Sequence, residues 1–416
     1  MKFLVLSLCF AFAGTAVAFS FVSSGQSRGG NFNVELPATT GKYSVGRASF
    51  YWVDASRDEP LTKNPNDRRE LMVTLWYPAE AASGSPAPYI DNLDKFARVI
   101  DPALIKIARS VRSYARAEAK LSSAESRYPV LIFSPGNNSN VATYAALIEE
   151  LTSHGYVVLG IDHPYESVAV LYPDGRIARF NGEDNRPKQS TPNLPEVFAR
   201  FYRERVDWRA GDASFALTQL EKLNARNPAT QFSNRLDLSR VGGVGHSIGG
   251  VAAAQMCQTD RRFNACLNLD GKAASRSLYP NAEGKGPDQP FMSIEKPLPD
   301  PTEKQLADWK TTRDQVEQHR KELREGDAEL LSTVRAGSYR VLLRGFQHQS
   351  FSDQLLILSS GDSNTKAGYQ REMTIIREYT LAFFDQTLKS KDSSLLKASP
   401  TDYPEVTVER FTPSRP

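Results

Sequence analysis

Short apolar runs alternate with longer amphipathic stretches along most of the chain, and this alternation predicts its architecture. Runs typical of buried strands lie at residues 128–133, 156–161, 265–269, 290–294 and 339–343. Residues 236–241 are also expected to lead into a buried strand. Stretches with helical spacing or composition lie between or after them, at 144–153, 195–223, 251–257 and 369–388. Strands that alternate with helices predict an α/β fold, with a mostly parallel central sheet covered by helices on both faces.

The N-terminal part of the chain has a different pattern. Residues 48–53 and 71–77 alternate apolar and polar positions, which is typical of antiparallel strands. The polar segment between them is expected to form a hairpin-type connection, and Pro78 is expected to end the second strand. We therefore expect antiparallel N-terminal strands beside the parallel sheet.

Residues 92–120 place apolar side chains at helical spacing, and Pro102 is expected to divide this segment into two helices. Basic side chains occupy the remaining positions: Lys95, Arg98, Lys106, Arg109, Arg112 and Arg116. A covering helix with a solvated charged face is the favoured interpretation. The alternative is a basic amphipathic surface that contacts lipid.

Residues 297–335 join the last two predicted strands and are long for such a connection. The segment begins with prolines and continues as a strongly charged stretch of helical composition. It is interpreted either as a lid over the carboxyl edge of the sheet or as solvated decoration. We expect one domain over residues 19–416, with insertions near 92–122 and 297–335.

Composition and the N-terminus limit the class of protein. The chain has 416 residues, 40% of them hydrophobic and 24% charged, with a formal charge of +3. This is an ordinary soluble composition, and the charge gives no sign of nucleic-acid binding. Residues 1–18 combine Lys2, an apolar stretch and a small-residue cleavage site, as in a signal peptide. A membrane anchor fits less well because Ser7 and Gly14 interrupt the stretch, so a secreted or periplasmic protein is expected.

Three cysteines are present, and Cys9 lies in the predicted leader. Cys257 and Cys266 remain as an even pair that an oxidising compartment would allow to bond. Spacing alone does not fix the geometry that a disulfide needs. A disulfide and two buried thiols are therefore both retained as interpretations.

Ser247 is a candidate nucleophile. Residues 245–249 read Gly-His-Ser-Ile-Gly, the G-x-S-x-G pattern of a nucleophile elbow. Strand-like residues precede the pattern and helix-forming residues follow it, as this sharp turn requires. A side chain at Gly245 or Gly249 would crowd the turn, which favours an elbow over a plain glycine-rich connection.

A serine hydroxyl needs a base to take its proton, and histidine is the usual one. The histidines after Ser247 are His319 and His348. His319 falls in the charged insertion, where a position on a helix surface is expected. His348 follows the last predicted strand, at the edge where the sites of open α/β sheets gather, so His348 is the expected base.

The carboxylate that orients the base has two candidates. Asp270 and Glu295 each end a predicted strand after Ser247, and their spacing does not separate them. Gly271 allows a sharp turn after Asp270 and mildly favours it.

Backbone N–H groups are expected to stabilise the negative charge that develops on a substrate carbonyl oxygen. One should come from Ile248 and the second from Asn137, in the loop after the strand at 128–133. Asn137 also begins an Asn-x-Ser glycosylation pattern, which we expect to be unmodified because a glycan would block the site. No metal-ligand cluster is recognisable, and no metal or organic cofactor is expected.

Taken in order, these motifs resemble those of the secreted platelet-activating-factor acetylhydrolases, serine lipases with the α/β-hydrolase fold. The matching stretches are residues 43–46, 75–78, 131–134 with Gly136, 151–155, 237–250, 260–263, 267–270 and 348–353. The resemblance implies Ser247 as nucleophile, Asp270 as acid and His348 as base. It also implies the amides of Asn137 and Ile248 as oxyanion donors, and it favours Asp270 over Glu295.

The chain departs from the family pattern in two places. The family's loop usually carries histidine where this chain has Pro135, and an apolar residue where it has Asn137. The insertion at 297–335 is longer than the family's loop. Both segments are expected to border the acyl pocket, so the reaction is better defined than the substrate.

The favoured function is that of an exported serine esterase acting on a small-molecule or lipid ester, most like 1-alkyl-2-acetylglycerophosphocholine. A broader carboxylesterase or polyester hydrolase with the same machinery is the first alternative. A non-catalytic binding protein on a hydrolase scaffold is the second, although such a protein would be expected to lack a member of the triad. Contact with a lipid surface is compatible with the pattern, and the oligomeric state is not indicated.

Overall fold

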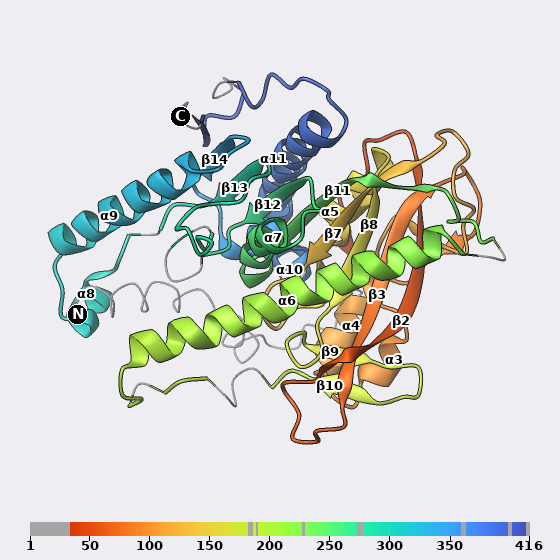
Figure 1. Cartoon of the computed structure of the whole chain (residues 1–416), viewed down its shortest axis with the longest axis horizontal. Helices are drawn as coiled ribbons and strands as arrows, with labels where there is room; N and C mark the ends of the chain where they lie inside the picture. Colours follow the sequence, from red (N-terminus) through yellow and green to blue (C-terminus); the bar gives the residue numbers. More distant parts are fainter. Residues whose placement is uncertain are drawn as a thin grey trace.

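The computed structural model describes residues 34–181, 186–188, 190–226, 229–272, 276, 278–298, 300–358, 363–397 and 402–412 (Figure 1). The predicted signal peptide, residues 1–18, lies outside the described residues. An eleven-stranded sheet organises the fold, in the order β15-β14-β13-β12-β11-β7-β8-β3-β2-β6-β4.

The middle of this sheet is parallel, as the apolar runs predict. Its strands are β14 (Ser338–Leu343), β13 (Phe291–Glu295), β12 (Ala265–Leu269), β11 (Leu236–His246), β7 (Tyr128–Ser134) and β8 (Val157–Asp162). Every residue of β7, β12 and β13 is buried. Strands covered on both faces need no polar alternation, and this explains why their sequences are mainly apolar.

Antiparallel strands flank the parallel part on both sides. On one side β3 (Arg68–Ala79) pairs with β8 and with the long β2 (Ser44–Asp58), which confirms the predicted N-terminal strands. Pro78 does not end β3 as expected, because at that level β3 pairs only with β2, opposite Val45. On the other side β15 (Val406–Phe411) pairs with β14, and the sequence pattern did not predict this strand.

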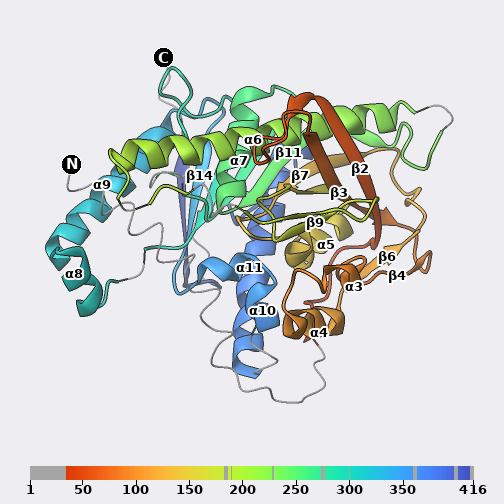
Figure 2. The same cartoon turned by 90° about the horizontal axis from the view of Figure 1, so that it is seen from below.

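Helices cover both faces of the sheet, as predicted (Figures 1 and 2). The helices α6 (Leu194–Asn224) and α7 (Ile248–Thr259) lie on one face and share a buried apolar cluster with it. The helices α5 (Ala145–Ser153) and α11 (Ser363–Leu388) lie on the opposite face and form a second cluster. No helix of the described residues has the length and apolar character to cross a membrane.

The prediction for residues 92–120 is only partly right. Two helices form, α3 (Leu93–Phe96) and α4 (Pro102–Ser110), and Asp101 caps the second through Ala103 N at 2.7 Å. Helix α4 ends at Ser110 because the next residue, Val111, is extended, and the chain continues as β5 (Val111–Arg112) and β6 (Ala115–Ala117). Pairing of β6 with β2 outweighs the helical spacing, because a sheet edge offers backbone partners.

The charged insertion forms two helices, α8 (Glu303–Trp309) and α9 (Arg313–Ser332), which begin at capping boxes. The C-terminal end of α9 packs Leu330 and Leu331 into the apolar cluster beneath α6 and α7. His319 of α9 is only 5% exposed, so its predicted surface position is wrong. Spacing along the helix did not reveal that this side of α9 faces the protein.

The remaining elements are short, and the sequence did not predict them as separate elements. They are β1 (Val34–Glu35), β4 (Ser85–Pro86), β9 (Ala169–Leu171), β10 (Ile177–Arg179), η1 (Val141–Tyr144), η2 (His348–Phe351) and α10 (Gln354–Leu358).

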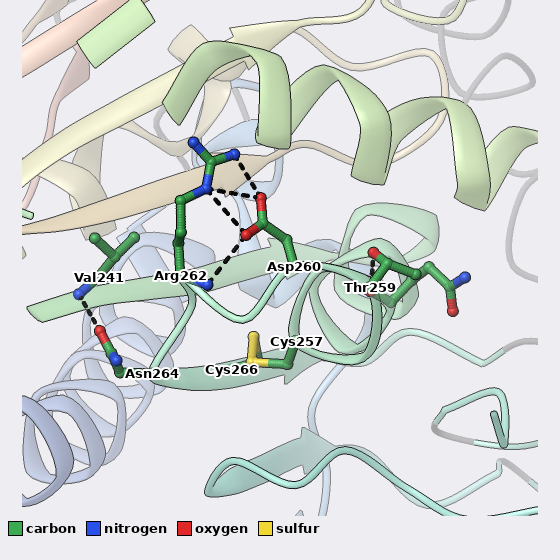
Figure 3. Close-up of a disulfide and its surroundings, with 8 residues drawn as sticks. Val241, Cys257, Thr259, Asp260, Arg262, Asn264 and Cys266 are labelled. Carbon is green, nitrogen blue, oxygen red and sulfur yellow. Dashed lines mark hydrogen bonds and ion pairs between the residues drawn. A yellow bond between two sulfur atoms is a disulfide. The ribbon is translucent and has the colours of Figure 1, made fainter. Parts of the chain in front are cut away.

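Cys257 and Cys266 form a disulfide, which decides between the two interpretations of this pair (Figure 3). The bond joins the last turn of α7 to the start of β12. The turn between them is also held by hydrogen bonds, because Asn264 accepts from Val241 N at 2.8 Å and Arg262 pairs with Asp260 at 2.6 Å.

Replacing both cysteines, as in Cys257→Ala/Cys266→Ala, should lower the free energy of unfolding by roughly 2–4 kcal/mol, because the cross-link restricts the unfolded chain. Urea unfolding of the oxidised wild type and the variant measures the difference. With a reductant present throughout unfolding, the two transitions should move together. Equal urea midpoints without reductant would contradict the prediction.

Candidate active site

Four polar segments meet at the carboxyl edge of the parallel strands. Ser247 follows β11, Asp270 follows β12, and residues 134–138 include the end of β7 and its loop. His348 lies at the start of η2, shortly after β14. Strands β7, β11, β12, β13 and β14 are neighbours in the sheet, so residues far apart in sequence come together.

Ser247 has the backbone of a sharp turn. Its φ is 56° and its ψ is −128°, a conformation that serine rarely adopts. The turn is fixed because Ser247 N–H donates to Leu269 O at 2.9 Å, and because Ser247 is the N-cap of α7. The side chain therefore stands at the positive end of a helix, as the elbow pattern predicts.

The glycines of the pattern are required by close contacts. A Cβ on Gly249 would lie 2.1 Å from Ser134 O, and one on Gly245 would lie 2.2 Å from Gly249 O. Both contacts are with backbone atoms, which have little freedom to move. Only glycine lets the β7 loop and the start of α7 approach so closely.

His348 is held by Asp270. The distance from His348 Nδ1 to Asp270 Oδ2 is 2.7 Å, and Asp270 also accepts from Lys296 N at 3.2 Å. Burial opposes ionisation of Asp270, but the hydrogen bond and charge of His348, with nearby lysines, lower its pKa overall. Glu295, the other candidate acid, pairs with Lys272 instead.

The ring of His348 lies beside the elbow. Its centroid is 4.4 Å from that of His246, the residue before Ser247. Burial, followed by the charge of His348, lowers the pKa of His246 well below its ordinary value, so His246 is neutral. His246 Nδ1 lies 2.9 Å from the hydroxyl oxygen of Tyr144, which also accepts from Gly136 N at 3.0 Å. The neutral ring of His246 therefore lies in contact with both Tyr144 and His348.

The loop after β7 has most of its polar groups engaged. Gly136 N–H donates to Tyr144, and Asn138 N–H donates to Glu166 O at 2.8 Å. Asn137 N–H has no acceptor among the described residues, and Asn137 is exposed. Ile248 N–H is the first of α7 and has no acceptor within the helix. These are the two amides that the sequence singles out.

The structure therefore brings Ser247, Asp270 and His348 to one edge, and leaves His319 in α9. Sequence reasoning missed Tyr144 and gave His163 no role. A signal for His163 existed, because it directly follows β8 at the same edge of the sheet. Among the described residues no group of His, Cys, Asp and Glu side chains could hold a metal ion.

The sequence also matches known proteins. The family described as "Platelet-activating factor acetylhydrolase, isoform II" matches residues 28–273, a range that includes Ser247 and Asp270 and ends before His348. The probable 1-alkyl-2-acetylglycerophosphocholine esterase of Arthroderma benhamiae is 26% identical over 67% of this chain and 65% of its own length. The platelet-activating factor acetylhydrolase of Cavia porcellus is 29% identical over 56% of this chain and 55% of its own length. The chain thus spans between half and two thirds of these relatives.

A solved structure is similar over more of the chain. A ferulic acid esterase from Streptomyces cinnamoneus aligns with a TM-score of 0.68 and 27% identity, covering 90% of this chain and 99% of that one. The similarity confirms the α/β-hydrolase fold that the mostly parallel sheet indicates.

Gly249→Ala should destabilise the protein by roughly 1–3 kcal/mol, because its Cβ would collide with the carbonyl oxygen of Ser134. The matched control is Gly368→Ala in α11, where a Cβ would meet nothing within 4 Å. Alanine has a higher helix propensity than glycine, so the free energy of unfolding of the control should rise by up to about 1 kcal/mol. Urea unfolding compares the two, and a Gly249→Ala variant as stable as the wild type would refute the close approach.

Proposed function

Because the chain belongs to the platelet-activating factor acetylhydrolase, isoform II, family, we propose that it is a serine hydrolase of carboxylic esters. One observation carries the proposal. Ser247 stands in a strained turn at a helix N-terminus, and the ring of His348, which Asp270 holds at 2.7 Å, lies 4.4 Å from that of His246, the residue before Ser247. A nucleophile, a base and an orienting acid in this arrangement are the requirements for acyl transfer.

In the proposed mechanism Ser247 Oγ attacks the ester carbonyl carbon while its proton passes to His348 Nε2. Nδ1 of His348 is occupied by Asp270, so Nε2 is the nitrogen left for the serine. The tetrahedral intermediate collapses as His348 returns the proton to the leaving alcohol. Water, deprotonated by His348, then cleaves the acyl-serine ester and restores the enzyme.

The intermediate places a negative charge on the former carbonyl oxygen. We assign its hydrogen bonds to the amides of Asn137 and Ile248. Asn137 N–H is the loop amide left without an acceptor among the described residues, and Ile248 N–H opens α7. Donors fixed before the reaction are effective because they need not reorganise as the charge develops.

The proposed substrate class is a phospholipid with a short acyl chain, as the names of the relatives suggest. A broader carboxylesterase is the second candidate. It is favoured by the ferulic acid esterase, which matches nearly the whole of its own length, whereas the acetylhydrolase relatives match only part of theirs.

We further propose that residues 19–416 form one catalytic domain whose insertions, near 92–122 and 297–335, border the entrance for substrate. The charge of Asp327, on α9, helps to raise the pKa of Lys272, which pairs with Glu295, so this insertion lies near the loop that follows Asp270. Export is also part of the proposal, since the disulfide between Cys257 and Cys266 suits an oxidising compartment.

Ser247→Ala should abolish ester hydrolysis and labelling by a fluorophosphonate while preserving the fold, because alanine fits the elbow. The wild type should be assayed on a short-chain acetylated phospholipid, an aryl acetate and a feruloyl ester, which separates the two substrate classes. Preference for the phospholipid supports the first candidate and preference for the feruloyl ester the second. Substantial hydrolysis by the pure Ser247→Ala variant would sink the assignment.

Asp270→Asn should lower kcat by about 10⁴-fold, because an amide holds His348 in the wrong tautomer. Glu295→Gln is the matched control, a carboxylate at the end of the adjacent strand that pairs with Lys272 rather than His348. It should lower kcat much less. Steady-state kinetics on a soluble acetyl ester measures both, and a larger loss in Glu295→Gln would identify it as the acid.

A further inference from the structure

We propose that Ser134, His163 and Asp212 form a buried positioning network. It fixes the loop after β7, residues 134–138, which we call the oxyanion loop. With Arg209, the network holds the loop so that the amide of Asn137 is aimed at the reacting oxygen. This inference rests on the proposed function of the site, and it adds residues that act through the backbone rather than on substrate.

The three side chains form a continuous chain of hydrogen bonds. Ser134 Oγ lies 2.9 Å from His163 Nε2, and His163 Nδ1 lies 2.7 Å from Asp212 Oδ2. All three residues have no exposed surface. The order of groups is that of a catalytic triad, but complete burial keeps substrate away from Ser134, which excludes a second nucleophile.

The direction of each hydrogen bond follows from the charges. Burial raises the pKa of Asp212, but the charge of Arg69 and the bond from His163 outweigh it, so Asp212 is ionised. An ionised carboxylate only accepts, so His163 Nδ1 carries a proton. Burial and the charge of Arg209 lower the pKa of His163 to about 4, which leaves Nε2 as an acceptor. The Ser134 hydroxyl therefore donates to Nε2.

Asp212 is itself anchored. Arg69 donates to its two oxygens at 3.0 and 2.7 Å, and Arg57 lies 2.9 Å from Oδ1. Arg69 is fully buried and reaches from β3, whereas Asp212 lies on α6. The network therefore ties the loop after β7 to a strand and a helix that are far from it in sequence.

A second set of contacts holds the following residues of the loop. Arg209 Nη1 donates to Pro135 O at 2.7 Å, and Arg209 Nε lies 3.4 Å from Glu166 Oε1. The backbone carbonyl of Glu166 accepts from Asn138 N–H at 2.8 Å. Arg209 lies on α6 like Asp212, so one helix supports the loop at two successive residues.

The contacts leave one amide free. Ser134, Pro135, Gly136 and Asn138 each have a polar group bonded to the surrounding structure, while Asn137 N–H has no acceptor among the described residues. A loop restrained on both sides of one amide is preorganised for an anion at that position. Loss of the restraint should reduce the stabilisation of the transition state more than it reduces the affinity for substrate.

The test is Ser134→Ala, which removes the hydrogen bond to His163 with the smallest change in volume. Its matched control is Ser338→Ala on β14, another buried serine, whose hydroxyl donates to Leu331 O at 2.8 Å. Both should lose a similar, small amount of stability. Only Ser134→Ala should lower kcat on a soluble acetyl ester, by roughly 10- to 100-fold, with KM within about twofold.

A transition-state analogue gives a readout that a merely structural role would not move. A trifluoromethyl ketone forms an oxyanion on Ser247, so its inhibition constant should rise in Ser134→Ala in proportion to the loss of kcat/KM. In Ser338→Ala it should stay at the wild-type value. His163→Gln, which keeps a polar side chain in the same space, provides a second variant for these measurements if Ser134→Ala does not fold.

The inference is overturned if Ser134→Ala matches Ser338→Ala in kcat, or if the analogue binds both variants equally well. Failure of the proposed function would appear differently, as activity that survives Ser247→Ala. Activity that depends on Ser247 but not on Ser134 would remove the positioning role alone.

Discussion

The close approach of two backbone segments is the constraint on which the site depends. A Cβ on Gly249 would lie 2.1 Å from the carbonyl oxygen of Ser134. A Cβ on Gly136 would lie 3.4 Å from Ser247 Cβ. This contact sets the loop that carries Asn137 against the helix that begins with Ile248. Buried side chains hold this loop, but they could not bring it against α7 if larger residues replaced the glycines of the elbow. Strain at Ser247 is tolerated because the turn is bonded to β12 and continued by α7.

Much of this arrangement could be predicted from the sequence, because its signals are local. Buried strands appear as apolar runs, the elbow as a five-residue pattern, and His348 as the histidine after the last parallel strand. The choice between Asp270 and Glu295 was not local, since both end strands and only the fold shows that Lys272 pairs with Glu295.

The sequence predictions that were wrong concern features that long-range packing decides. Helical spacing continues past Ser110, but the edge of β2 takes residues 115–117 as a strand. His319 looks exposed until α9 is packed, and the order Ser134, His163, Asp212 has no pattern that spacing could reveal. The family match ends at residue 273, so it also leaves out His348, the proposed base.

The disulfide between α7 and β12 joins residues nine positions apart, whereas the hydrogen bond that His348 donates to Asp270 joins residues 78 apart. Short loops close at little entropic cost, and long ones wait until the intervening strands have assembled. The helix that follows Ser247, the proposed nucleophile, and the strand that precedes Asp270, the proposed acid, are thus expected to be cross-linked early in oxidative folding. His348, the proposed base, is expected to reach Asp270 only when β13 and β14 have added to β12. Hydrolytic competence is then expected to be a late event in maturation, so its recovery after denaturation should report the docking of β14 rather than the first collapse of the chain.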